Sequence, residues 1–329
     1  MTAAAAPRAF VWELTLAVLI LLAAIWASLT SPFYLSFDQI TFSLQQSVAV
    51  VGLIALGLVA VVVVGEIDIS LPAILALGNI LFMHLAVMNC PIWLAVPLVL
   101  VVCALAGLFN GLLVVAFGLP SLAVTLGAMG AYRALALLLA GQEGFADFPA
   151  DYLWLGSSSV ADVLPASLVL VALAALLFGF VMHGTVLGRC FFACGLNARA
   201  ARLSGVRVRL VKTTAFTIGG VMAGLASLVY IGQFQSARAD NASDILLFVV
   251  TAVVLGGVDI FGGRGNVVGV LLSLLLLGTL KNGMGLANVA GSVQTLVIGT
   301  LLIVSVLIAQ GGSWTGAFRR LRIRAASKP

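Results

Sequence analysis

Long apolar runs with few polar interruptions make up most of this chain. Stretches such as LTLAVLILLAAIWASL (14–29) and VGLIALGLVAVVVV (51–64) have no polar face to offer to water. An apolar run of ~20 residues is the length a helix needs to cross a bilayer. We therefore predict an all-α integral membrane protein. Splitting the runs at glycines, prolines and polar breaks predicts ten spans, at 11–30, 43–64, 70–89, 92–117, 120–140, 165–183, 213–232, 245–258, 266–281 and 293–310.

The composition supports the same class. Hydrophobic residues make up 63% of the 329 residues and charged residues 8%, whereas soluble domains are roughly 45–50% apolar. The first apolar run follows Arg8, as it would in a signal peptide. That run contains Glu13, however, and no clear small-residue cleavage site follows it, so we expect it to be retained as the first span.

The positive charges gather in three places. All but four of the sixteen Lys and Arg residues are Arg8 or lie in the segments 189–212 and 319–328. Such residues accumulate in short cytoplasmic loops, so we expect both termini and the segment 189–212 to be cytoplasmic, with Arg238 and Lys281 as outer-side exceptions. The net charge of +5 then reflects topology and contact with anionic membrane lipid, and we expect no nucleic-acid partner.

The chain divides around an acidic loop at 141–164, which we expect to be external. Five predicted spans precede it and five follow it, which would give two inverted halves, an arrangement common in transporters. GEIDI (65–69) is echoed by GGVDI (256–260), and NGLL (110–113) loosely by NGMG (282–285), although the spacing between the echoes differs. The loop contains four acids and no cation: Glu143, Asp147, Asp151 and Asp162.

Residues for catalysis are scarce. Neither histidine, His84 or His183, belongs to a metal-binding or triad pattern, and none of the three lysines stands in the Gly-Lys-Ser/Thr context of a phosphate-binding loop. We expect no catalytic residue, metal or cofactor. We interpret the cysteines as small apolar residues in preference to a zinc or redox site; they are Cys90, Cys103, Cys190 and Cys194.

Polar groups at membrane depth are the stronger signal. Glu66, Asp68 and Ser70 separate two apolar runs in VVVVGEIDISLP, and ionisable residues at that depth suggest a transport function. In the alternative interpretation the segment is a surface turn, where Asp68 or Ser70 caps the next helix and Pro72 occupies its first turn. A broken, capped helix that lines a pathway would satisfy both interpretations.

Three further polar residues interrupt the next spans. Asn110 and Thr125 are candidates for the pathway or for hydrogen bonds between helices. For Arg133 we favour a position near the interface, reached by its long side chain, over contact with a solute.

The segment GLNARAARLSGVRVRLVK (195–212) concentrates five cations without an acid. Asn197 is placed to cap a two-turn helix that ends at Ser204, and Gly205 suits the left-handed position after it. Leu196, Ala200 and Leu203 recur along one face of that helix. A purely topological basic loop would need none of these features, so we favour a short amphipathic helix that docks in a partner's groove.

Four motifs together resemble the permease subunits of bacterial ABC importers for monosaccharides, the ribose/galactose/xylose group. They are GEIDIS (65–70), GLFNGLLVVAFGLPSLAVTLGAMGAYRALALLLAG (107–141), GRCFFACGLNARAARLSGVRVRLVK (188–212) and AVVLGGVDIFGGRGNVVG (252–269). The resemblance covers about residues 45–308. It implies a roughly ten-span permease, a double-cassette ATPase partner, a periplasmic sugar-binding protein and pairing with a second permease copy or a paralogue.

The resemblance also implies a location and roles for residues. The chain would be one permease domain, 1–329, of the bacterial inner membrane, with a cytoplasmic coupling loop at about 184–212 and a basic tail at about 311–329. The residues expected to couple to the ATPase are Gly195, Asn197, Arg199, Ala200, Arg202, Leu203, Ser204 and Gly205.

The likeness is greatest to permeases assigned to rhamnose, with autoinducer-2 permeases as near neighbours. It rests on GEIDIS together with GLPSLAVTLGAM (118–129) and FADFPADYLWLG (145–156). The chain departs from the commoner pattern at Glu66, where many relatives have Gly, and at Leu71-Pro72, where Val-Gly is usual. We expect import by alternating access, with rhamnose favoured as the solute. The rival classes are a proton-coupled secondary transporter using Glu66 or Asp68, and a membrane-embedded enzyme.

Overall fold

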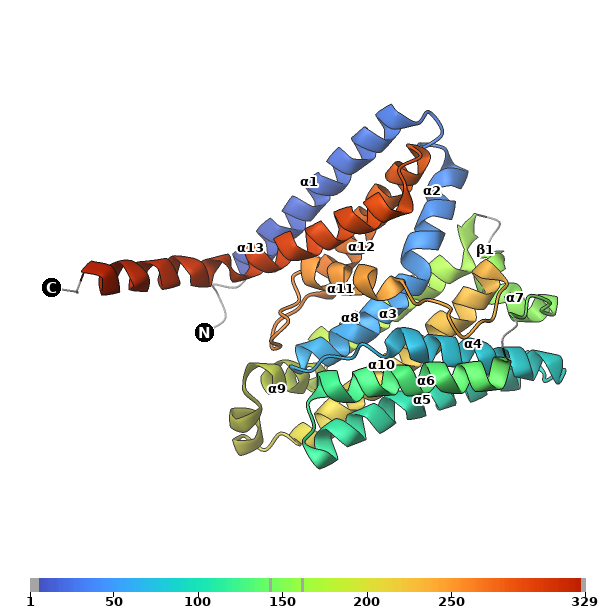
Figure 1. The fold of residues 1–329 in the computed structure, drawn as a ribbon, viewed down its shortest axis with the longest axis horizontal. Helices are drawn as coiled ribbons and strands as arrows, with labels where there is room; N and C mark the ends of the chain where they lie inside the picture. The colour runs from blue at the N-terminus through green and yellow to red at the C-terminus, as the bar shows by residue number, and fades with distance from the viewer. Residues whose placement is uncertain (1–5, 142–143, 161–162, 327–329) are drawn as a thin grey trace.

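The computed structural model is built almost entirely of helices (Figure 1). It describes residues 6–141, 144–160 and 163–326, so Glu143, Asp162 and Lys328 lie outside the described residues. A short antiparallel hairpin pairs β1, Ser159–Val160, with β2, Leu164–Pro165. The helices are α1 Ala6–Thr30, α2 Phe37–Leu44, a π-helical turn Gln45–Ala49, α3 Val50–Val63, α4 Leu71–Val87, α5 Ile92–Phe117, α6 Ser121–Ala140, α7 Ala150–Ser157, α8 Ala166–Gly184, α9 Val186–Leu203, α10 Val208–Phe234, α11 Ile245–Leu255, α12 Val267–Leu286 and α13 Gly291–Ala326.

Each of the ten predicted spans corresponds to a helix, and the all-α membrane class is confirmed. Within the described residues, eight helices are long and apolar enough to cross a membrane, and α2, the π-helical turn and α3 count as one of them. The other two, α4 and α11, are apolar but shorter, at 17 and 11 residues. Each of these short helices adjoins one of the two echoed segments, GEIDI and GGVDI, where the chain leaves helical geometry.

The basic stretch is more helical than the short helix predicted within it. Helix α9 occupies most of the segment 184–212, and α10 begins at Val208 rather than at residue 213. Splitting the chain by polarity placed the start of α10 too late in the sequence. Arg, Leu and Ala are all good helix formers, so a helix continues into charged sequence that would not lie in the apolar part of a bilayer.

Helix α3 lies at the centre of the molecule, and all its residues are buried. Figure 1 shows α4, α5, α6 and α10 running together on one side and α1, α12 and α13 on the other. Helix α10 packs along α3, α4 and α5, while α11, α12 and α8 contact α3 from the remaining directions. This central position explains why α3 is apolar all round, because a helix enclosed on every side has no polar face.

Glycines let α5 and α10 approach each other closely. A Cβ at Gly107 of α5 would overlap the carbonyl oxygen of Phe216, and one at Gly220 of α10 would overlap that of Cys103. Small residues at such crossings allow membrane helices to gain van der Waals contact that larger side chains would prevent. These two glycines are therefore helix-packing residues.

Candidate functional site

A buried hydrogen-bond network surrounds the break between α3 and α4. The Asp68 Oδ1 atom accepts hydrogen bonds from the Ser70 backbone N–H, at 2.8 Å, and from the Ser70 hydroxyl, at 2.6 Å. Asn110 of α5 donates to Ser70 Oγ at 2.8 Å, and the Tyr132 hydroxyl of α6 donates to Asn110 Oδ1 at 2.9 Å. Asp68, Ser70 and Asn110 are fully buried. The structure thus brings together three predicted pathway residues, two from the α3–α4 break and one from α5.

Helix α6 holds the non-helical backbone of this break. The Ile67 N–H donates to Ser121 Oγ at 3.1 Å, and the Ile69 N–H donates to Thr125 Oγ1 at 3.4 Å. Thr125, the fourth predicted pathway residue, is therefore a support for the broken segment. A non-helical backbone at membrane depth is tolerated only where protein groups or water satisfy it, and the two hydroxyls of α6 do so here.

Both interpretations of GEIDIS find a counterpart in this arrangement. Ser70 is the N-cap residue of α4 and Pro72 lies in its first turn, as a capped start requires, but the Ser70 side chain caps no backbone N–H. Instead it binds Asp68, whose second oxygen, Oδ2, is buried with no hydrogen-bond partner among the described residues. A cap does not need a buried carboxylate, because Ser70 alone could serve. The pathway or gating role of this network stays a prediction.

Glu66, the fifth predicted pathway residue, forms an ion pair with Lys212 in the second turn of α10. Both side chains are largely buried. Lys212 ends the basic stretch that begins at Gly195, so the pair joins the α3–α4 break to the end of the predicted coupling segment. Sequence reasoning treated the two residues separately, because nothing local relates positions 146 residues apart.

The two echoed segments meet at one junction, together with α9. The Gly263 N–H donates to the Val63 carbonyl at 2.8 Å. A Cβ at Gly262 would overlap backbone atoms of Gly65, and one at Gly195 would overlap the Val63 carbonyl and the Gly263 amide. Gly65, Gly262 and Gly263 also adopt positive φ angles, of 81°, 88° and 77°, which only glycine adopts at little cost. Side chains are thus excluded where the three segments touch.

Helix α9 bends sharply before its last two turns. Asn197 departs from helical geometry, with φ −163° and ψ 97°, and its Oδ1 accepts a hydrogen bond from the Ala200 N–H at 3.0 Å. Gly205 ends the segment with φ +85°. The predicted N-cap and left-handed terminus are both confirmed, since capping depends on local sequence alone.

The surface of this bent segment is open. Leu196 is 65% exposed and Leu203 is 86% exposed, and Ala200, Arg199 and Arg202 are exposed as well. Leu203 and Ala200 lie on the short helix, whereas Leu196 precedes the bend at Asn197, so the predicted stripe is not one continuous helical face. With the arginines, these residues still form an apolar and basic surface that the described chain leaves largely uncovered. We refer to residues 196–205 as the docking segment; its contact with an ATPase remains a prediction.

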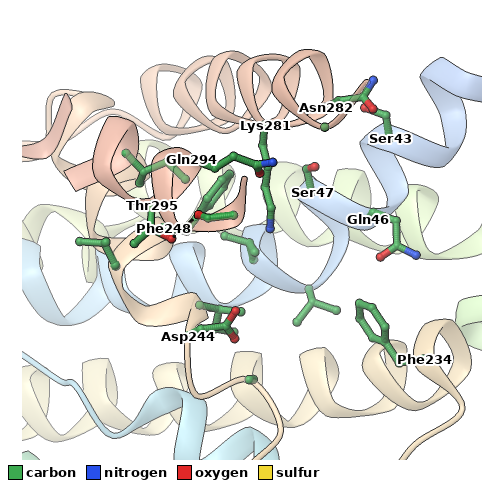
Figure 2. Close-up of a pocket in the computed structure, with 18 of the residues that line it drawn as sticks. Ser43, Gln46, Ser47, Phe234, Asp244, Phe248, Lys281, Asn282, Gln294 and Thr295 are labelled. Carbon is green, nitrogen blue, oxygen red and sulfur yellow. Dashed lines mark hydrogen bonds between the residues drawn. The ribbon is translucent and has the colours of Figure 1, made fainter. Parts of the chain in front are cut away.

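A cavity of about 800 Å³ lies elsewhere, between the ends of α2, α10, α11, α12 and α13 (Figure 2). Helix α3 separates it from the α9 side of the molecule, because the cavity reaches Val50 and Val51 at the start of α3 whereas Gly195 touches Val63 at its end. None of the five predicted pathway residues is among its lining residues in the described chain. The polar ones are Ser43, Gln46, Ser47, Tyr230, Asp244, Lys281, Asn282, Gln294 and Thr295.

Sequence reasoning missed this cavity because each helix contributes only one or two of its polar residues. A signal was present in the runs TFSLQQSV (41–48) and LKNG (280–283), which place polar groups inside apolar spans. Lys281 was also an outer-side exception to the charge pattern. In Figure 2 its side chain extends from α12 toward the middle of the cavity, with Asp244 and Gln46 on other walls.

The structure also bears on the predictions for a metal site and for Arg133. Within the described residues, no group of three His, Cys, Asp or Glu side chains lies close enough together to hold a metal ion.

Arg133 does not extend freely to the interface: its Nη1 donates to the carbonyl oxygens of Ala239, at 2.8 Å, and Asn241, at 3.2 Å. This arginine therefore ties α6 to the loop between α10 and α11.

A multi-pass helical bundle with a broken central helix, a polar cavity and an exposed docking segment defines a membrane transport subunit. The chain matches the family described as branched-chain amino acid transport system / permease component over residues 40–306, and it belongs to that family. It is accordingly a transport subunit and not an enzyme. No solved structure matches the chain significantly.

Two similar curated proteins are permeases of the autoinducer 2 import system. The autoinducer 2 import system permease protein LsrD of Enterobacter sp. (strain 638) is 35% identical over 302 residues, which cover 90% of this chain and 92% of that protein. The protein of the same name from Yersinia pseudotuberculosis serotype O:3 (strain YPIII) is 34% identical over 306 residues, covering 91% of each chain. The resemblance drawn from the four motifs, with autoinducer-2 permeases as neighbours, is confirmed.

Proposed function

We propose that this chain is the permease of an ATP-driven importer that brings a monosaccharide-sized, hydroxyl-rich solute into a bacterial cell. The observation that carries the proposal is the docking segment, which presents an uncovered apolar and basic face at the end of α9. A transport subunit that has no nucleotide-binding loop of its own needs a surface to which an ATPase binds and through which the ATPase changes the subunit's conformation. The family and its relatives supply the class of importer.

The proposed assembly has three kinds of partner. A double-cassette ATPase binds the docking segment from the cytoplasm, and a periplasmic binding protein delivers the solute to the opposite side. A second permease, either a copy or a paralogue, completes the pathway. In this arrangement both termini are cytoplasmic, as the clustering of Lys and Arg in α9, the 207–212 stretch and the tail favours.

The proposed mechanism is alternating access. ATP closes the cassettes, the docking segment moves, and the junction of Val63, Gly195 and Gly263 transmits that motion to the centre of the bundle. We assign Glu66, Asp68, Ser70, Asn110 and Thr125 to gating at the α3–α4 break, because they link that break to α5, α6 and α10. The protein supplies differences in binding free energy between states and no covalent chemistry.

Rhamnose is the first candidate solute, on the motifs GEIDIS, GLPSLAVTLGAM and FADFPADYLWLG. Autoinducer 2 is the second candidate, and a specific observation favours it: the similar curated permeases carry that name. Uptake of each labelled compound, measured in cells that express the permease with its partner genes and in cells that lack only the permease, separates the two. Permease-dependent uptake of neither compound would refute both assignments.

Co-purification tests the importer class itself. We expect a nucleotide-hydrolysing subunit to accompany the native chain in mild detergent, and Arg199→Glu/Arg202→Glu to abolish that association. Arg207→Glu/Arg209→Glu is the matched control, since it makes the same change of charge just beyond Gly205. Equal loss in both variants would show that bulk charge, rather than the docking segment, attracts the ATPase. No ATPase with the native chain, and uptake that collapses with the proton gradient, would favour a secondary transporter.

A further inference from the structure

The polar groups that face the cavity of Figure 2 are poorly satisfied by the protein itself. Within the described residues, no hydrogen bond reaches the side chains of Ser43, Gln46, Ser47 or Asp244, although a helical bundle of this kind offers many carbonyl partners. The Nδ2 atom of Asn282 is buried without a partner. Ser43 and Ser47 are buried, whereas Asp244 is exposed. Buried polar groups are normally paired, so the unpaired ones around this cavity indicate a ligand or water that they bind, and the exposed Asp244 carboxylate is accessible to the same ligand.

Lys281 is the most informative of these groups. Its Nζ lies 5.7 Å from the centroid of the Phe248 ring, and in the described chain the ion pairs join other residues, Glu66 with Lys212 and Arg238 with Asp240. Lys281 is an exposed cation in the largely apolar helix α12, and it has no carboxylate partner in the described chain. Its ammonium group is therefore available to donate hydrogen bonds to a solute. Asp244 lines the same cavity from α11 and likewise lacks an ion-pair partner.

These charges define the chemical class of the ligand. One cation and one anion on the same cavity cancel, so a solute with net charge would be repelled by one of them. Hydroxyl groups suit both, because each can donate to the Asp244 carboxylate or accept from the Lys281 ammonium. The remaining wall is apolar and aromatic, contributed by Phe42, Tyr230, Phe234 and Phe248, as in sites that bind small organic ligands.

We propose that this cavity is a receiving site for the solute, in which Lys281 and Asp244 bind hydroxyl groups of a neutral polyhydroxylated molecule. The volume of about 800 Å³ exceeds what one monosaccharide fills, so waters complete the hydrogen bonding. The inference rests on the proposed import function for the direction of travel. The inference adds a solute-binding site within the permease. In this site Lys281 and Asp244 determine which solutes are accepted.

The test uses the complete importer, permease with ATPase and binding protein, reconstituted in lipid vesicles. The probe is labelled L-rhamnose, or labelled autoinducer 2 if the wild-type importer transports only that compound. Two quantities are measured together: the solute delivered and the ATP hydrolysed when the loaded binding protein is present. The variants are Lys281→Met and Asp244→Asn, with Lys281→Arg as the conservative exchange and Val293→Ala as an exposed control on α13 outside the cavity.

We expect Lys281→Met and Asp244→Asn each to lower the solute delivered per ATP by about tenfold or more, as loss of a charge-assisted hydrogen bond to the solute would. ATP hydrolysis stimulated by the binding protein should stay within about twofold of wild type, a smaller change than loss of one ordinary hydrogen bond gives. Lys281→Arg should retain most delivery and Val293→Ala all of it.

Three outcomes would overturn the inference. Normal delivery per ATP by Lys281→Met and Asp244→Asn would exclude these side chains from solute binding while leaving the importer function intact. A parallel fall in ATP hydrolysis and delivery, not restored by Lys281→Arg, would assign Lys281 a structural role. If the wild-type importer delivers neither compound, the proposed function fails first, and the neutral-solute assignment falls with it.

Discussion

The backbone amide of Gly263 donates a hydrogen bond to the carbonyl of Val63 at 2.8 Å, and it joins two segments that resemble each other in sequence. Val63 ends α3 just before GEIDI, and Gly263 follows GGVDI on the way to α12. Gly195 of α9 lies against both partners, with no room for a side chain. Gly195 immediately precedes the docking segment, so a displacement of that part of α9 acts on both the central helix and the second echoed segment.

Gly195→Ala should disrupt this junction. The added methyl group would overlap the Val63 carbonyl and the Gly263 amide, and backbone on both sides leaves little scope for relief, so we expect a loss of about 2 kcal/mol or more of stability. The fall in unfolding temperature in detergent and the yield of folded protein measure the effect. Gly127→Ala is the control, because that position on α6 is open and Ala is a better helix former than Gly. Equal stability of the two variants would contradict the described packing.

Cys194 provides a reporter next to the same junction. Burial is the main cause that raises the pKa of its thiol above the ordinary value, with a smaller contribution from Cys190. A raised pKa lowers the thiolate fraction at neutral pH, and the thiolate is the species that reacts with maleimides. We expect a chain with Cys194 as its sole cysteine to be labelled slowly at pH 7 and faster as the pH rises.

The comparison for Cys194 is a cysteine-free chain with Ser204→Cys, which places an exposed thiol on the docking segment. Labelling at pH 7 should be much faster there. If ATP turnover in the full assembly opens the junction, the rate at Cys194 should also increase under turnover. Rapid labelling of Cys194 at neutral pH in the resting permease would show that the thiol is not buried as described.

The sequence was most informative where structure is decided locally. Apolar runs predicted a helix at each of the ten positions, eight of them long enough to span a membrane in the described chain. Asn197 and Gly205 predicted the ends of the docking segment, because hydrophobic length and helix capping depend on neighbouring residues. Helix ends in charged sequence were misplaced, as at Val208, since polarity marks where the apolar part of a span stops and not where the helix stops.

What the sequence could not reveal is which distant residues meet. Asn110 was a candidate, but its bonds to Ser70 and Tyr132 join three separate elements, and no periodicity encodes such contacts. The pairing of Glu66 with Lys212 is of the same kind. The cavity was missed for a related reason: Lys281 and Asp244 belong to separate segments of the chain, and only the packing of several helices around them creates a site.

Asp68→Asn tests the network at the α3–α4 break. The amide is nearly the same size and retains an oxygen that can accept from Ser70, so we expect the fold to survive. Replacement of the buried carboxyl group should lower uptake by about tenfold if that group takes part in gating, given the strength of the hydrogen bonds it makes. Ser121→Ala is the matched control, as it removes one support of the same segment without altering the carboxyl group. Full uptake by Asp68→Asn would refute a role of the Asp68 carboxyl group in transport.

The ion pair between Glu66 and Lys212 should behave as a unit in transmission from the docking segment. Glu66→Gln and Lys212→Gln each leave one largely buried charge unpaired, which is more costly than removing both. We therefore expect each single variant to transport less well than the double variant Glu66→Gln/Lys212→Gln, with a coupling free energy of about 1 kcal/mol or more in the mutant cycle. Uptake and ATP hydrolysis are measured side by side, since impaired transmission lowers uptake more than hydrolysis. Additive losses in the double variant would mean that the two side chains act independently, and transmission would then depend on the Val63–Gly263 junction.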